Sequence, residues 1–176
     1  HDFCGDFLEQ NNNSAKRLAL YNDGYLCTVR GFLKADKEMM MPAIDYMMRN
    51  PSKYAVVNYL SNYYGFTMAD MVRYQKKHNQ ANGEENRDGT DYNCTWNCGV
   101  EGNTKKQRII ELRGQQLKNA FALLFLSQSM PLIFMGDEFG NSQKGNNNAY
   151  CQDNAISWLN WNDIKKNKEF HAFYKD

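Results

Sequence analysis

The segment YAVVNYL, from Tyr54 to Leu60, decides the fold class of this chain. It is short and rich in valine and tyrosine, which is typical of a β-strand. One further strand is predicted before it in the sequence, in RLALY (Arg17–Tyr21), and one after it, in the continuous apolar run Leu132–Met135. An unbroken apolar run of this kind is typical of buried parallel sheets.

Helical patterns alternate with these strands. They are predicted at Tyr25–Leu33, Lys37–Arg49, Thr67–Tyr74 and Lys105–Ser127, and in a final helix that Asn162 or Asp163 caps and that stops at Asp176. The alternation, without a tight hairpin signal, predicts an α/β fold with a parallel sheet.

Several local signals refine these helices. Asn22-Asp23-Gly24 is a turn or cap before the first helix, and Asp36 opens the second, with Pro42 in its first turn. Thr104 to Gln107 fits a capping box for the long helix. The last turns of that helix, Phe121 to Leu126, are apolar nearly all round, which predicts deep burial.

Length and charge narrow the class of protein. At 176 residues the chain has the size of one domain, residues 1–176, with an irregular polar segment at 1–14. Its net charge of +1 gives no electrostatic basis for binding nucleic acid or an anionic membrane, and no run approaches transmembrane length. Basic pairs such as Lys76-Lys77 are expected at the solvated surface.

The cysteines predict neither a disulfide framework nor a metal site. There are five of them, an odd number scattered along the chain, which favours a reducing compartment and a cytoplasmic location. Cys94 and Cys98 have the wrong spacing for a zinc knuckle, and His78 is too isolated to complete a site. We expect no metal and no cofactor.

Two long polar stretches carry the functional signal. The first, Tyr74–Gly102, is rich in Asn and Gly and has neither helical nor strand period. Such a connection is a binding loop, an active-site loop or disorder, and its varied composition disfavours disorder. The second stretch is Asn141–Asn154. Both follow predicted strands, on the side that carries the chemistry in βα-barrels and open α/β sheets.

Four segments resemble isoamylase-type glycogen debranching enzymes, which belong to the α-amylase clan of glycoside hydrolases, family thirteen. They are HNQANGEENRDGT (His78–Thr90), WNCGVEG (Trp96–Gly102), GDEFG (Gly136–Gly140) and GNNNAYCQDNAISW (Gly145–Trp158), in the family's order, and a weaker match covers Tyr21–Asp36. The resemblance implies a (β/α)₈ barrel that hydrolyses α-1,6 branch linkages with retention of configuration. By this resemblance the chain is a partial barrel with about strands six to eight and their helices.

The same resemblance implies that the chain has no catalytic residues. Retaining hydrolysis needs two carboxyl groups about 5 Å apart, and in the family these follow strands four and five, which this chain does not contain. The family's third acid lies in a His-Asp-Gly-Phe-Thr motif, which reads Tyr63-Tyr64-Gly65-Phe66-Thr67 here. A phenol with a pKa of about 10 cannot act as a carboxylate at neutral pH.

Other candidate residues have structural interpretations. Glu84-Glu85 is expected to be a solvated loop tip, and Asp137-Glu138 an anchor at the end of a strand. Phe121 and Phe125 are expected in the core, and Trp158 and Trp161 are also expected to pack. We therefore predict that no new active site replaces the missing acids.

The resemblance implies an α-glucan as the ligand, and the many rings and amides of the chain fit this in kind, because rings suit the apolar faces of sugars and amides suit their hydroxyls. The residues expected to contact it are Tyr63, Tyr64, His78, Asn79, Asn82, Glu84 and Trp96.

Three hypotheses stay open: an inactive piece of a debranching enzyme, a non-catalytic α-glucan-binding or interaction module, and a structural remnant without a ligand. A sheet of only a few strands also exposes its edges, so we expect either a homo-oligomer formed through an edge or a repacked α/β domain.

Overall fold

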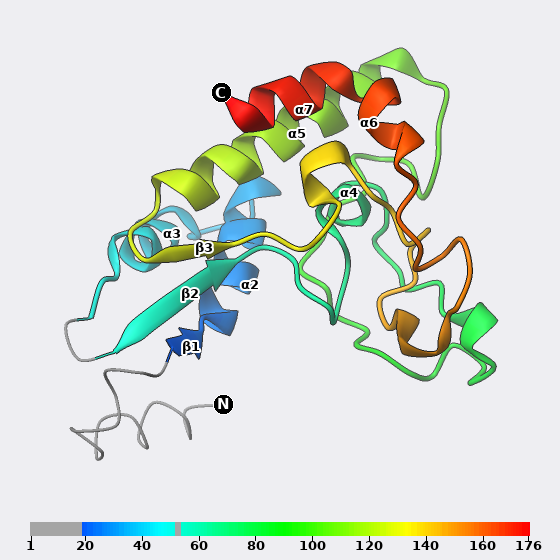
Figure 1. Cartoon of the computed structure of the whole chain (residues 1–176). Helices are drawn as coiled ribbons and strands as arrows, with labels where there is room; N and C mark the ends of the chain where they lie inside the picture. Colours follow the sequence, from blue (N-terminus) through cyan, green and yellow to red (C-terminus); the bar gives the residue numbers. More distant parts are fainter. Residues whose placement is uncertain (1–18, 52–53) are drawn as a thin grey trace. The chain divides into compact units, whose positions relative to one another are not determined.

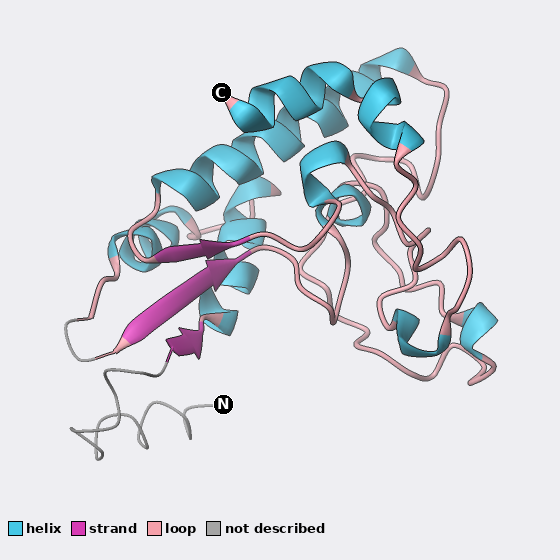
Figure 2. Ribbon diagram, in the orientation of Figure 1, coloured by secondary structure: helices cyan, strands magenta, loops and turns pink. Residues whose placement is uncertain are grey.

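The computed structural model of the chain describes residues 19–51 and 54–176 (Figure 1). The irregular segment at 1–14 and the first residues of the RLALY strand lie outside these ranges. The chain divides into two compact units, one of residues up to 60 with 122–132, the other of residues 61–121 with 133–176. Figure 2 shows long loops where the sequence has its polar stretches.

The first unit contains a three-stranded parallel sheet in the order β1-β2-β3. The strands are β1 (Ala19–Tyr21), β2 (Ala55–Tyr59) and β3 (Met130–Leu132). The predicted parallel α/β sheet is therefore confirmed. Within the described ranges β1 and β3 are the two edge strands, and self-association through either edge stays a prediction.

The third strand lies earlier than predicted. It contains Met130 and Pro131, which the sequence places in a break after the helix, and it stops at Leu132. Pro131 pairs with Asn58 of the central strand. A proline, which has no N–H to donate, is tolerated in this strand because β3 lies at an edge of the sheet.

Two helices of the first unit, α2 (Asp23–Leu33) and α3 (Met40–Met48), lie on the far side of the sheet in Figure 1. The predicted cap of α2 is confirmed, because the Asn22 side chain accepts a hydrogen bond from the Tyr25 N–H at 3.2 Å. The predicted start of α3, at Lys37, is wrong. Glu38 has a φ of 62°, in the left-handed region that a right-handed helix excludes, so α3 starts after it and Asp36 does not cap it.

The long helix α5 (Gln107–Leu126) begins two residues beyond the predicted Lys105, and the predicted capping box is wrong. The Thr104 hydroxyl accepts a hydrogen bond from the Lys106 N–H at 3.2 Å, in a turn that precedes the helix. The Gln107 amide donates forward along the helix to Glu111, at 3.0 Å, instead of back to a cap.

The end of α5 is less buried than its apolar sequence predicts. Phe121 and Leu124 are buried, at 1% and 2% exposed, so the core position of Phe121 is confirmed. Phe125 and Leu126 are 44% and 78% exposed, so the prediction of burial all round the helix is wrong. Residues 121 and 124 are three positions apart and share one face, and that face is the one that packs.

The second unit has short helices between long loops. These are α4 (Met68–Met71), α6 (Asn162–Lys166) and α7 (Lys168–Lys175), with single 3₁₀ turns η2 (Gln80–Asn82), η3 (Asp137–Phe139) and η4 (Ala149–Cys151). The single final helix of the prediction is wrong because Asn167 interrupts it, and the Asn167 amide donates to the Phe139 carbonyl at 2.8 Å. The helix α7 packs on α5 through Phe121 and Phe170, whose rings lie 5.6 Å apart (Figure 1).

Two tryptophans of this unit depart from the expected packing. Trp158 and Trp161 are 61% and 65% exposed, although the Trp161 ring lies 5.8 Å from the ring of Phe139. Their indoles cover the surface more than they fill the core.

The buried amide of Asn58 allows a test of what stabilises the first unit. Asn58 is 1% exposed in the central strand, accepts a hydrogen bond from the Asn22 amide at 2.8 Å and donates to the Gln128 carbonyl at 2.7 Å. We predict that Asn58→Ala lowers the free energy of unfolding by about 2–3 kcal/mol, because it leaves the buried Asn22 amide without its acceptor and also removes the hydrogen bond to the Gln128 carbonyl. Urea unfolding measures this change.

The matched control is Asn50→Ala, at an exposed position, with an expected change within about 0.5 kcal/mol. Equal losses in the two variants would show that the buried amide does not hold the first unit together.

Candidate functional site

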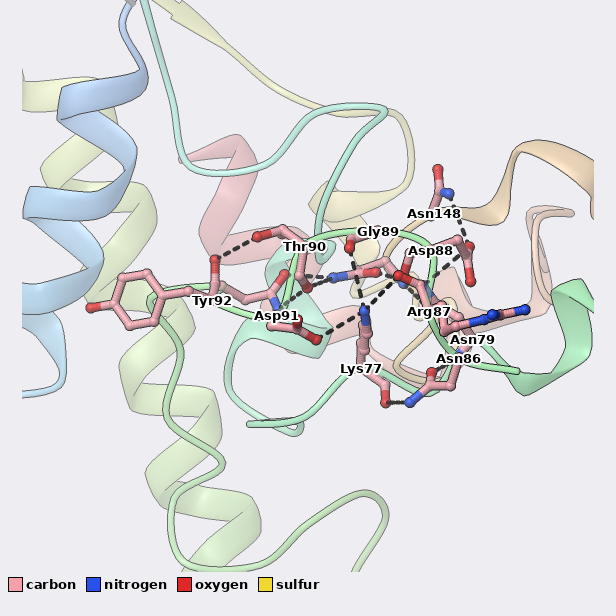
Figure 3. A network of polar contacts seen from close by, with 12 residues as sticks. Lys77, Asn79, Asn86, Arg87, Asp88, Gly89, Thr90, Asp91, Tyr92 and Asn148 are labelled. Atoms are coloured by element: carbon pink, nitrogen blue, oxygen red, sulfur yellow. Dashed lines mark hydrogen bonds and ion pairs between the residues drawn. The ribbon is translucent and has the colours of Figure 1, made fainter. Parts of the chain in front are cut away.

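The two polar loops of the second unit are joined by side-chain amides, which we call the amide network (Figure 3). Its members come from the first loop (Asn79, Asn82, Asp88 and Asn93) and from the second loop (Asn146, Asn147 and Asn148). Neither loop has regular structure beyond a single 3₁₀ turn, so these side chains supply the partners that a helix or sheet would otherwise provide.

A reciprocal pair lies at the centre of the amide network. The Asn79 amide donates to Asn147 Oδ1 at 2.8 Å, and the Asn147 backbone N–H donates back to Asn79 Oδ1 at 3.0 Å. The Asn147 amide also donates to the Thr90 carbonyl at 2.8 Å and to Asn93 Oδ1 at 2.9 Å. Asn79 and Asn147 are 0% and 1% exposed, and their polar atoms are satisfied within the protein.

Asp88 supplies the negative charge of the network. Its Oδ2 accepts hydrogen bonds from Asn82 Nδ2 at 2.7 Å and Asn148 Nδ2 at 2.9 Å, and Figure 3 shows this carboxylate facing Asn148. Desolvation alone would raise the pKa of Asp88, but these amide donors and the charge of Lys77 outweigh it and lower the pKa below its ordinary value. Asp88 is therefore an anion that orders the amides around it.

Lys77 supplies the positive charge, and its expected place at the solvated surface is wrong. It is 8% exposed, and its ammonium donates to the carbonyls of Arg87 and Gly89 at 3.3 Å and pairs with Asp91 at 2.9 Å (Figure 3). The first loop closes around this side chain. Sequence spacing does not reveal that closure, because the acceptors are backbone carbonyls that every residue carries.

Asp70 anchors the second loop to α4. It is 0% exposed, and it accepts hydrogen bonds from the Ser142 hydroxyl and from the backbone N–H groups of Gln143, at 2.8 Å, and Gly145, at 3.3 Å. Burial raises the pKa of Asp70, and the Ser142 hydrogen bond opposes that shift.

The predicted anchoring role of Asp137 and Glu138 is confirmed. Asp137 is 1% exposed and accepts hydrogen bonds from the Ser61 hydroxyl and, at 2.9 Å, from the Met68 N–H. Glu138 accepts from the Gly136 N–H at 2.8 Å. Both carboxylates hold the backbone around the predicted strand end.

The predicted tyrosine pair is presented next to the amide network. Tyr63 and Tyr64 are 80% and 48% exposed. The neighbouring Gly65 N–H donates to the Asn147 carbonyl at 2.9 Å, so the turn that carries both rings is tied to the centre of the network. The rings face solvent from a backbone that is fixed in place.

The other predicted residues divide into two groups. Asn82 lies in the network, and Glu84 lies exposed at a loop tip. His78 is outside it, with Nε2 3.0 Å from the Glu101 carboxylate. Trp96 is half-buried, and its backbone N–H donates to Met71 at 3.3 Å.

Several residues that hold the site together were not predicted as site residues from the sequence. Lys77, Asp88, Asp70 and the run Asn146–Asn148 were not among the predicted contacts. The consecutive asparagines were the one visible signal, since such a run needs many hydrogen-bond partners wherever it is buried.

No metal site or membrane span is found in the described part of the chain. Residues 19–51 and 54–176 contain no cluster of three or more His, Cys, Asp or Glu side chains that could hold a metal ion. No helix in these ranges has the length and apolar character needed to cross a membrane.

Comparison with known proteins supports the resemblance that the loops carry. No family model matches the chain. The glycogen operon protein GlgX homolog of Mycobacterium tuberculosis is 50% identical over 125 residues, which are 71% of this chain and 17% of that protein. The glycogen debranching enzyme of Serratia proteamaculans is 44% identical over 153 residues, 82% of this chain and 23% of that enzyme. By sequence, the chain belongs to the isoamylase-type debranching enzymes.

Plant members of this group match a still larger share of the chain. Isoamylase SU1, chloroplastic, of Zea mays is 36% identical over 163 residues, 88% of this chain and 20% of that protein. The chain thus spans about a fifth of the length of these debranching enzymes and isoamylases.

Two glycines offer a matched test of the amide network. Gly89 has a φ of +71°, and a Cβ there would lie 2.3 Å from Asn147 Oδ1 and 2.8 Å from Asn79 Nδ2. Gly83 has a φ of +79° with nothing within 4 Å. We predict that Gly83→Ala costs about 1–2 kcal/mol of unfolding free energy for its left-handed backbone. Gly89→Ala should cost about 1–3 kcal/mol more through overlap.

Chemical denaturation of both glycine variants measures the difference. Equal losses would mean that the close approach of Gly89 to the central amide pair is not needed.

Acid should weaken the contacts of Glu101. This carboxylate accepts hydrogen bonds from the Asn97 amide and from the N–H groups of Gln75 and Lys76, at 2.9 to 3.1 Å, besides contacting His78. Desolvation would raise the pKa of Glu101, but the hydrogen bonds lower it below its ordinary value. A lowered folded-state pKa gives stability that is present above the unfolded value of about 4.3 and is lost as pH falls through the folded value.

We therefore predict that wild type is more stable than Glu101→Gln at pH 7 and that this advantage shrinks steadily between pH 5 and pH 3. Thermal unfolding at several pH values measures it. Glu84→Gln, at the exposed loop tip, is the control. A constant difference between wild type and Glu101→Gln across this range would contradict the assignment.

Proposed function

We propose that this chain is the part of an isoamylase-type (β/α)₈ barrel that carries strands six to eight, and that its loops help to hold an α-1,6-branched glucan. The observation that carries the proposal is the Asn79–Asn147 pair, which folds the two debranching-type loops onto each other beside the exposed tyrosine turn. The printed names of the relatives, glycogen debranching enzyme and isoamylase, support the same substrate class.

Each predicted contact residue takes a role that fits its exposure. Tyr63 and Tyr64 present rings that can lie against glucose, and ligand sites commonly combine such rings with a few fixed polar groups. Asn82 and Glu84 offer polar groups at the edge of the network. Asn79 is fully buried and fully hydrogen-bonded, so we propose that it positions the loop and does not touch sugar.

His78 and Trp96 are proposed to lie at the periphery of the glucan surface. Glu101 holds His78, and the backbone of Met71 holds Trp96. Both side chains keep part of their surface accessible to solvent.

Hydrolysis by this chain alone is not part of the proposal. Tyr64 stands where the family has its third acid, and the family's other two acids belong to strands that this chain does not contain. The buried carboxylates of Asp70 and Asp137 accept hydrogen bonds that anchor the backbone. We propose that the chain binds glucan without cleaving it.

The exposed tyrosine pair favours a second candidate function, a non-catalytic α-glucan-binding or interaction module. Replacing a His-Asp pair by two phenols removes an acid and adds stacking surface. For such a module, glucan binding is the whole function, whereas for a part of a debranching enzyme it is one step of the enzyme's function.

Titration with maltoheptaose and with a branched glucan tests the shared claim of binding. We predict measurable binding by the wild-type chain and about tenfold weaker binding by the double variant Tyr63→Ala/Tyr64→Ala, since aromatic contacts are each worth roughly 0.5–1.5 kcal/mol. The control is Tyr92→Ala, whose ring is 70% exposed and points away from the network in Figure 3. A flat wild-type titration, or an equal loss in the Tyr92 variant, would refute the proposed surface.

The same preparation is assayed for new reducing ends on pullulan. We expect none above the buffer rate. Robust turnover would refute the proposed inactivity and leave the binding claim standing.

A further inference from the structure

A groove of about 720 Å³ lies in the second unit, outside the amide network. It is bounded by the first turns of α5, by α6 and α7, and by the segments around Arg73 and Thr104, and no member of the amide network lines it. Its volume is that of a small-molecule site. Ile110, Leu117 and Phe170 give it an apolar side.

The groove concentrates positive charge in a chain whose net charge is only +1. The charged side chains that line it are basic at Arg73, Arg113, Lys118, Lys166 and Lys168, and acidic at Glu111 and Glu169. Some of these charges are already engaged. Lys166 pairs with Asp163 at 2.9 Å, and the Lys118 ammonium lies 5.3 Å from the centre of the Phe173 ring.

The two arginines are the strongest indication of a ligand. Arg113 is 6% exposed and donates to the backbone carbonyls of Gly102 at 2.7 Å, of Asn97 at 2.9 Å and of Val100. Its Nε is buried and has no hydrogen-bond partner. A buried donor without a partner carries a desolvation cost that an acceptor would remove.

Arg73 adds a second cation beside the first. It is half-buried and lines the same groove. Burial lowers the pKa of Arg113 most. The charge of Arg73 also lowers it, while Cys98, Tyr74 and Glu101 oppose the shift, so the two guanidinium groups repel one another in a site that is only partly compensated. An anion bound in the groove would relieve that repulsion.

We propose that this groove binds a phosphate-bearing metabolite, with its phosphate at Arg73 and Arg113 and its remaining part against Ile110, Leu117 and Phe170. Guanidinium groups bind phosphate through paired, charge-assisted hydrogen bonds. Glu111 and Glu169 are placed to accept hydroxyl groups of a ribose or a hexose. A nucleotide and a sugar phosphate share this chemistry, and the groove is large enough for either.

Isothermal titration of the full chain distinguishes these sources. The probes are ADP, glucose 1-phosphate, and the phosphate-free compounds adenosine and glucose. We expect binding of at least one phosphate compound and no binding of its phosphate-free partner. ADP alone would identify a nucleotide site, and glucose 1-phosphate alone a sugar-phosphate site.

The variant Arg73→Gln should bind the phosphate probe about tenfold more weakly or worse, because a hydrogen bond to a charged group is lost. The matched control is Arg108→Gln, an exposed arginine of the same helix α5 that does not line the groove, and it should bind as wild type does. Circular dichroism checks that each variant folds. If Arg73→Gln does not fold, Lys168→Gln replaces it, and we expect this variant to bind the phosphate probe more weakly as well.

The proposal is overturned if neither phosphate compound binds at millimolar concentration, or if a folded groove variant binds as tightly as wild type. Glucan titration depends on Tyr63 and Tyr64, which do not line this groove, so either result is independent of the proposed glucan surface.

Discussion

The hydrogen bonds between Asn79 and Asn147 are the constraint on which the second unit depends. A loop without helix or strand has no partners of its own for its backbone groups, and burying those groups unpaired is costly. Here two such loops satisfy each other. The pair is nearly inaccessible to water. Its amide groups also donate hydrogen bonds to backbone carbonyls of the first loop, and the Asn147 carbonyl accepts a hydrogen bond from Gly65 in the tyrosine turn. Long polar loops can therefore present a fixed surface.

The carboxylates of this unit show how context decides the role of an acid. Asp70, Asp137 and Glu101 each accept hydrogen bonds from backbone N–H groups and thereby anchor a turn. These hydrogen bonds give each carboxylate a structural role. Acidic residues and a debranching-type sequence together do not establish catalysis, and the proposed function rests on binding surfaces for that reason.

Local patterns in the sequence predicted the elements better than their ends. The alternation of strands and helices and the Asn22 cap depend on neighbouring residues, and both are confirmed. The start of α3 depends on the left-handed backbone at Glu38, and the strand at Pro131 depends on its place at a sheet edge. Neither condition is visible in a local sequence pattern. The path of the chain sets the backbone conformation at Glu38, and pairing with a distant strand sets the position of Pro131 in the sheet.

The sequence by itself determined the parallel α/β class and the family, since strand periodicity and long ordered motifs are properties of the chain alone. Only the tertiary structure decided which polar residues are buried. Lys77 has the sequence context of a surface lysine, and Asn147 that of an ordinary loop residue, yet both are enclosed. The carbonyls that Lys77 contacts lie 10 and 12 positions away in the same loop, and the Asn79 amide that Asn147 contacts lies 68 positions away. Only folding brings these groups within hydrogen-bonding distance.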